Sequence, residues 1–130
     1  MINKAIDLWA EELSATDDGY QLCWNFLDVN EKTKALRFIQ EKHRHHYVIS
    51  HGKLRMILAA YTDIAPERIS FDTGTFGKPF IVEEGKPHKV KFNLSHSDNR
   101  MVVAVGYCEH IGIDIEVWND KPAINEKLPS

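Results

Sequence analysis

The spacing of apolar residues along the chain changes near Pro66. Before this point apolar side chains recur mainly at helical intervals, whereas after it they tend to alternate with polar ones. We predict a short helix over Glu31–Gln40, capped by Asn30, and a longer helix over Lys42–Tyr61. Pro66 is expected to end the helical region.

Short runs with strand character lie on both sides of these helices. Upstream, we predict strands around Ile6–Trp9 and at Tyr20–Trp24, separated by a turn at Asp17–Gly19. The downstream strands are predicted at Ile69–Asp72, Pro79–Val82, Val90–Leu94, Met101–Tyr107 and Ile111–Trp118. Helices followed by a mostly sequential, mostly antiparallel sheet predict an α+β fold, with the short and the long helix packed on the sheet.

The regular pattern stops after Trp118. The segment 119–130 contains Pro122 and Pro129 and few apolar residues. We therefore predict one domain over residues 1–118, followed by a linker or tail over 119–130.

Composition narrows the class of protein. The 130 residues are 43% hydrophobic and 27% charged, as in ordinary soluble domains. No apolar run approaches the roughly 20 residues of a spanning helix, and the N-terminus lacks a signal-peptide core. Cys23 and Cys108 are far apart and lack zinc or redox spacing, so we expect both to be reduced and buried. A cytoplasmic protein without membrane contact is expected.

Positive charge is concentrated in the predicted helices. Lys32–Arg55 holds seven Lys and Arg residues against the single acid Glu41, although the net charge of the chain is −3. His43 and His46 share a helical face, which allows a zinc site, but Arg44 would repel a cation. Arg55 follows Arg44 by eleven residues and falls near the same face, so we expect a basic helix facing an anion. Nucleic acid is an alternative anion, against which the net charge argues.

Two carboxylates occupy one face of the last predicted strand. Asp114 and Glu116 lie two positions apart within Ile111–Trp118, and such side chains project side by side at roughly 6.6 Å. The pair could form half of a divalent-metal site. The alternative is a solvated acidic face of an amphipathic strand.

Two further motifs carry polar groups. Phe92–Ser97 ends a strand with Ser95 and His96, a pair suited to phosphate binding or proton transfer; neighbours on a strand face opposite ways, which disfavours a serine hydrolase. Gly74–Pro79 lacks the spacing of a Walker phosphate loop. Its glycines are compatible with a hairpin turn bearing a solvated Lys78, or with a rigid turn that holds Lys78 against a ligand.

Taken in order, three motifs closely resemble those of Sfp-type 4′-phosphopantetheinyl transferases: Phe76–Pro79, Phe92–Ser97 and Ile111–Glu116. Upstream, the residues that resemble this family are Ile6–Trp9, Glu31, Ala35–Phe38, Arg44 and Leu54–Arg55. The resemblance runs from about Ala5 to Trp118. His51 stands where many members have arginine.

The resemblance implies transfer of the 4′-phosphopantetheine arm of coenzyme A to a serine of an acyl or peptidyl carrier protein. This Mg²⁺-dependent reaction releases 3′,5′-ADP. By resemblance, coenzyme A would contact Arg44 at its 3′-phosphate, Gly77, Lys78 and Pro79 at its nucleotide, and Ser95 and His96 at its phosphates. Asp114 and Glu116 would hold the metal, and the catalytic residues would be His96, Asp114 and Glu116. No catalytic base is assigned.

The resemblance covers only the N-terminal half of the family's two-domain chain. A Lys-Glu motif typical of the second half does not occur in these residues. The resemblance therefore implies a truncated chain with a missing second domain, or a second subunit that supplies the missing surface. The alternative function is a non-catalytic module that binds coenzyme A or a carrier protein.

Overall fold

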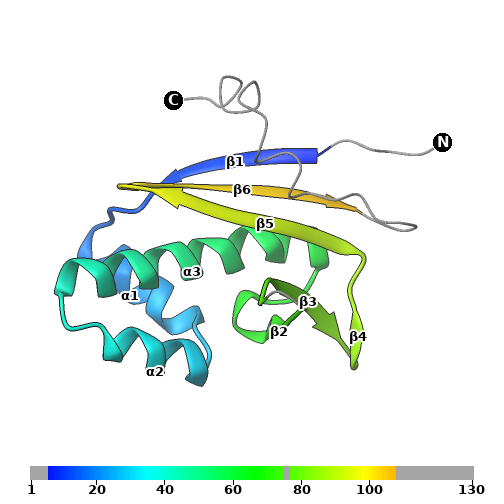
Figure 1. Cartoon of the computed structure of the whole chain (residues 1–130), viewed down its shortest axis with the longest axis horizontal. Coiled ribbons are helices and arrows are strands. Elements are labelled where there is room, and N and C mark those ends of the chain that lie inside the picture. The colour runs from blue at the N-terminus through cyan, green and yellow to red at the C-terminus, as the bar shows by residue number, and fades with distance from the viewer. Residues whose placement is uncertain (1–5, 75–76, 108–130) are drawn as a thin grey trace. The chain divides into compact units, whose positions relative to one another are not determined.

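The computed structural model describes residues 6–74 and 77–107. In chain order the elements are β1 (Ile6–Glu12), α1 (Asp17–Phe26), α2 (Val29–Arg37), α3 (Glu41–Thr62), the 3₁₀ helix η1 (Pro66–Arg68), β2 (Ser70–Thr73), β3 (Pro79–Glu83), β4 (Lys86–Pro87), β5 (Val90–Ser97) and β6 (Arg100–Tyr107). Helices precede most of the strands, which confirms the predicted α+β class (Figure 1).

The chain divides into two compact units. The described part of the first comprises residues 6–10, 69–74, 77–95 and 102–107. The second comprises Glu11–Arg68 and His96–Met101. All the α-helices described belong to the second unit, and β2, β3 and β4 belong to the first.

The described strands form two three-stranded sheets, where one sheet was expected. One has the order β2-β3-β4 with antiparallel pairs, such as Phe71 with Ile81. The other has the order β1-β6-β5 (Figure 1). Its central strand β6 is buried continuously over Val103–Val105, as a strand covered on both faces should be. The short strand β4 was not predicted.

The strand predicted at Tyr20–Trp24 is wrong, because this segment lies within α1. The Thr16 side chain accepts a hydrogen bond from the N–H of Gly19 at 3.1 Å and caps the helix. The turn predicted here is instead the first helical turn. Cys23 and Leu27 are buried four positions apart, which is a helical rather than an alternating spacing.

The two predicted helices are present, with one cap corrected. Asp28, not Asn30, caps α2: its side chain accepts from the N–H of Glu31 at 2.8 Å, and Glu31 accepts from the N–H of Asp28 at 2.9 Å. This reciprocal pair is a capping box. α3 extends one residue beyond the prediction at each end.

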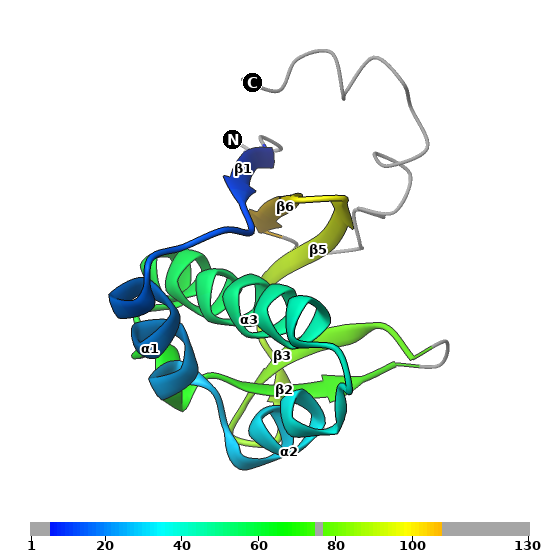
Figure 2. The same cartoon turned by 90° about the vertical axis from the view of Figure 1, so that its left-hand side faces the viewer.

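Close packing holds α1 alongside α3 (Figure 2). A Cβ atom added at Gly52 of α3 would overlap Cys23 of α1, so only glycine permits this approach. Cys23 is a buried free thiol, as expected, whereas Cys108 lies outside the described residues. The contact fixes the position of α1 beside the helix that carries most of the candidate site.

Candidate functional site

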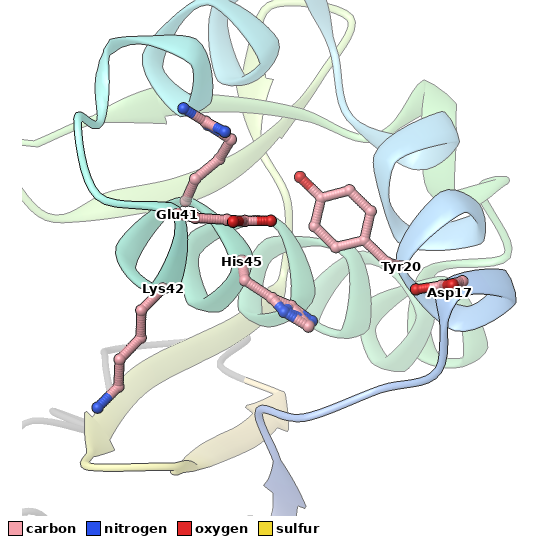
Figure 3. A pocket seen from close by; sticks show the side chains of 6 residues that line it. Asp17, Tyr20, Glu41, Lys42 and His45 are labelled. Carbon is pink, nitrogen blue, oxygen red and sulfur yellow. The ribbon is translucent and has the colours of Figure 1, made fainter.

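The N-terminal end of α3 and the start of α1 border a cavity of about 460 Å³. Its lining residues are Asp17, Tyr20, Glu41, Lys42, Arg44 and His45. Figure 3 shows the rings of Tyr20 and His45 turned toward each other, and their centroids are 5.0 Å apart in an edge-to-face arrangement. The Lys42 side chain extends away from these rings. The cavity therefore combines aromatic surface with charges of both signs.

Arg44 and His45, which line this cavity, each contain a nitrogen that lacks a hydrogen-bond partner within the described residues. One terminal nitrogen of Arg44 donates to the carbonyl oxygen of Phe38 at 3.0 Å. Within the described residues, however, Arg44 Nε and His45 Nε2 are buried without hydrogen-bond partners. Buried polar atoms in native structures are normally satisfied. Because the Nε–H of Arg44 is buried, its side chain would have to shift before a ligand with acceptor oxygens could satisfy it.

The pKa of Tyr20 depends on burial and on charged residues of the same cavity. Burial raises the pKa of its hydroxyl, the charge of Arg44 opposes this change, and Glu41 adds to it. Tyr20 therefore stays neutral at physiological pH and can donate its hydroxyl proton to a ligand. Sequence reasoning missed Tyr20 because the segment was read as a strand.

A second group of basic side chains surrounds His46 on α3. Burial lowers the pKa of His46, and Lys42, His45, His43 and His96 each lower it further. No acid contributes to this shift. His46 therefore lies among basic groups, an environment that suits an anion.

This environment includes one residue singled out from the sequence, His96. Ser95 and His96 lie near the C-terminal end of β5, and both are exposed. The structure thus brings His96 near His46, a residue that the sequence suggested only as a possible zinc ligand together with His43. The helical spacing of His43 and His46 was the available signal, but nothing local showed that β5 would end beside it.

Gly77 and Lys78 lie between β2 and β3, and Pro79 is the first residue of β3. Gly77 has φ +77°, and its N–H donates to the carbonyl oxygen of Gly74 at 3.0 Å. The N–H of Gly74 in turn donates to the carbonyl oxygen of Lys78 at 2.8 Å. A positive φ favours glycine at position 77. The turn is thus closed by backbone bonds, and it belongs to the first unit, whereas Arg44 and His96 belong to the second.

The prediction that Arg55 faces an anion with Arg44 is wrong. Arg55 is fully buried and donates to Glu31 at 2.9 Å, to Asp28 at 3.2 Å and to the carbonyl oxygen of Pro66 at 2.8 Å. Three acceptors from two elements neutralise and orient its guanidinium. Arg55 therefore joins α3 to α2 and η1.

His51 belongs to this buried cluster as well. Its Nδ1 lies 3.3 Å from Glu31 Oε2, and its ring packs 4.1 Å from that of Tyr47. Burial would raise the pKa of Glu31, but hydrogen bonds from His51 and the Asp28 N–H, with the Arg55 charge, lower it overall. His51 is thus a hydrogen-bond partner of Glu31 in this chain.

The structure also bears on the metal hypotheses. In residues 6–74 and 77–107, no three or more His, Cys, Asp or Glu side chains are grouped so that they could hold a metal ion. The possible zinc site at His43 and His46 is therefore not supported. Asp114 and Glu116 lie outside the described residues.

Together these features define an α+β domain with a histidine-containing basic locus on α3 that also includes His96. Residues 11–108 match the family model described as the N-terminal part of 4′-phosphopantetheinyl transferase. The chain therefore belongs to the 4′-phosphopantetheinyl transferase family, as its motifs predicted. None of the helices described is both long and apolar enough to cross a membrane.

Two curated relatives show how much of the family chain is present. The 4′-phosphopantetheinyl transferase HetI of Nostoc sp. is 33% identical over 116 residues, which cover 89% of this chain and 49% of HetI. The 4′-phosphopantetheinyl transferase gsp of Aneurinibacillus migulanus is 33% identical over 97 residues, which cover 72% of this chain and 38% of that protein. The chain spans about half the length of these relatives, or less.

Proposed function

We propose that this chain supplies the coenzyme A-binding half of a 4′-phosphopantetheinyl transferase. In the proposed reaction, a serine oxygen of a carrier protein forms a bond to phosphorus of the coenzyme A pyrophosphate. The phosphorus–oxygen bond to the nucleotide breaks, 3′,5′-ADP leaves, and the serine proton passes to a base that is not assigned. Positioning and charge neutralisation are the main contributions required of the protein in such a transfer.

The basic environment of His46 is the observation that carries this proposal. Lys42, His43, His45 and His96 all act on His46 with the same sign. A phosphate group bound there would favour the protonated imidazole, which could donate a charge-assisted hydrogen bond. We assign His96, and with it His46, to the phosphates of coenzyme A.

The remaining contacts extend this proposal along the ligand. The cavity beside Arg44, with its unsatisfied Nε–H, is proposed for the 3′-phosphate. Gly77, Lys78 and Pro79 are proposed to contact the nucleotide, and Ser95 a phosphate. The backbone hydrogen bonds that join Gly74 to Gly77 and Lys78 support this assignment because they constrain these residues.

Asp114 and Glu116 are proposed to hold Mg²⁺. Their carboxylate oxygens are the type of ligand that Mg²⁺ prefers, and Mg²⁺ commonly binds one or two carboxylates together with substrate phosphate. When bound, it would supply neutralisation of pyrophosphate charge. The residues of the chain would bind and orient the ligand, with His96 at the phosphates.

An acyl or peptidyl carrier protein is the proposed acceptor, and the cytoplasm is the proposed location. The second domain or a second subunit would complete the site. Two measurements distinguish this proposal from the alternative, a module that binds coenzyme A or a carrier protein without transfer. Calorimetry measures coenzyme A binding to the 130-residue chain, and mass spectrometry detects transfer to apo acyl carrier protein. Binding without a gain in carrier mass, also in a full-length protein containing both halves, would favour the module.

The metal assignment is tested by Asp114→Ala in that full-length protein. We expect a loss of Mg²⁺-dependent transfer of at least about a hundredfold, because a catalytic metal contributes several kcal/mol to charge stabilisation. Asp120→Ala is the matched control, an acid that follows the motif in the sequence. Undiminished transfer by Asp114→Ala would refute the metal role.

A further inference from the structure

The solvent face of α2 displays apolar side chains that a folded domain normally covers. Val29 is 75% exposed, Leu36 is 64% exposed, and Ile39, two residues beyond the helix, is 94% exposed. Isolated exposed apolar residues are common, but three within eleven positions are not scattered singly. This segment therefore has the composition of an interaction surface.

Helical geometry aligns two of these side chains. Val29 and Leu36 are seven positions apart, so they lie about 20° from each other around the helix axis. The opposite face of α2 carries Glu31 and Ala35, which are buried. Val29 and Leu36 thus form a stripe that points away from the α3 contact, and Ile39 follows Leu36 by three positions.

Positive charges border this stripe. Lys32 lies on one side of it around the helix, and Arg37 lies on the other. Lys32 Nζ is 5.6 Å from the centroid of the Trp24 ring, whereas Arg37 is exposed. Within the described parts of the chain, neither of these two cations forms a salt bridge. We call Val29, Lys32, Leu36, Arg37 and Ile39 the α2 surface.

We propose that the α2 surface docks an acidic protein surface that carries exposed apolar side chains, namely that of the carrier protein. The identity of the partner rests on the proposed function, whereas its acidic and apolar character rests on charge complementarity with the α2 surface. An apolar centre with a polar, charged rim is typical of interfaces between partners that associate and separate. Positive rim charges would speed encounter with an acidic carrier.

Fluorescence anisotropy tests this docking with labelled apo acyl carrier protein of a fatty-acid synthase and the 130-residue chain. Leu36→Glu, alone and with Ile39→Glu, is expected to weaken carrier binding by roughly tenfold or more, as loss of an interface anchor does. Changing Lys32 and Arg37 to glutamine should lower the association rate and its dependence on salt. Coenzyme A affinity, measured in parallel by calorimetry, should stay unchanged.

Leu22→Glu is the matched control. Leu22 is 46% exposed on α1, a helix with acids in its first turn and no Lys or Arg. Leu22→Glu should leave carrier binding unchanged. This result would exclude a general effect of an added negative charge. Circular dichroism verifies that each variant is folded.

The possible outcomes separate this inference from the proposed function. Carrier binding that is absent in the unmodified chain, or unaffected by Leu36→Glu, overturns the docking site even if coenzyme A binds. If the unmodified full-length protein neither binds coenzyme A nor transfers its arm, the proposed function is overturned instead. Sedimentation velocity that reveals a dimer abolished by Leu36→Glu would assign the α2 surface to a second copy and also overturn the docking site.

Discussion

His46 and Tyr47 are consecutive residues of α3, yet they lie in opposite electrostatic environments. Burial lowers the pKa of His46, and four surrounding basic groups lower it further. Burial raises the pKa of Tyr47 to about 12, with Glu31 and Asp28 adding to the increase and Arg55 opposing it. Only basic groups act on the charge of His46, whereas acids and a basic group both act on Tyr47.

Basic residues therefore have two different roles in α3. Arg55 is held by Glu31, Asp28 and a backbone carbonyl, so its charge is satisfied inside the protein. The charges around His46 are not opposed by an acid in the shift of its pKa. A count of basic residues along α3 combines these two groups, although only the second is suited to an anionic ligand.

Arg55→Met is expected to have the largest effect on stability, because it removes the buried positive charge that Glu31 and Asp28 neutralise. Glu31 would lose a buried partner, and the carbonyl oxygen of Pro66 would lose a donor. We expect the free energy of unfolding to fall by about 3–5 kcal/mol, the usual cost of breaking a buried ion pair. Urea denaturation followed by circular dichroism measures this change.

Lys53→Met provides a control two positions away on the same helix. Lys53 Nζ is 3.4 Å from Glu11 Oε1 in a partly exposed pair, and it also donates to the carbonyl oxygen of Glu12. The expected cost is about 1 kcal/mol or less. Equal losses for the two variants would show that burial does not distinguish the two cations.

The fold was largely predictable because its strongest signals are local. The long periodic segment of α3 and the alternation in β5 were recognised from sequence, with boundaries within a few residues. The segment Tyr20–Trp24 was misassigned because five apolar and polar residues fit either period. Including Leu27 and the Thr16 cap would have favoured the helix, since both lie outside the short window.

The candidate site was predictable only where a motif carries its own geometry. The turn at Gly77 follows from glycine and proline chemistry, and the structure closes it with backbone bonds. The burial of Arg55 depends on Asp28, which is 27 positions away, and helical periodicity cannot reveal such a partner. Helical spacing predicted that Arg44 and Arg55 lie near one face of α3, but it could not show that acids cover Arg55.

A smaller effect is expected from His46→Gln. Coenzyme A phosphate would raise the lowered pKa of His46, so binding should take up a proton and affinity should increase as the pH falls from about 8 to about 6. The variant should bind coenzyme A about tenfold more weakly near pH 6, the value expected for one charge-assisted hydrogen bond, and should lose most of the pH dependence. Calorimetry in buffers of different ionisation enthalpy measures both quantities.

His51→Gln is the corresponding change on the acid-matched side. Glutamine can still donate a hydrogen bond to Glu31, and His51 does not contribute to the pKa shift of His46. Coenzyme A affinity and its pH dependence should be preserved in this variant. If His51→Gln alone removed the pH dependence, the proposed phosphate contact at His46 would be wrong.

The smallest effect is expected from Tyr47→Phe, which retains the ring against His51 and removes the ionisable hydroxyl. The pKa of Tyr47 is about 12 in the folded chain and roughly 10 in an unfolded one, so folding favours the neutral phenol. This pKa difference contributes to the free energy of unfolding. The contribution is fully present below pH about 10 and declines as the pH rises toward 12, by on the order of 1 kcal/mol after allowance for solvent exposure. Urea denaturation between pH 9 and 12 should show a flatter decline for Tyr47→Phe. Lys42→Gln, on the cationic side, should retain the original decline; identical curves for all three proteins would mean that the acids near Tyr47 do not create the opposite environment.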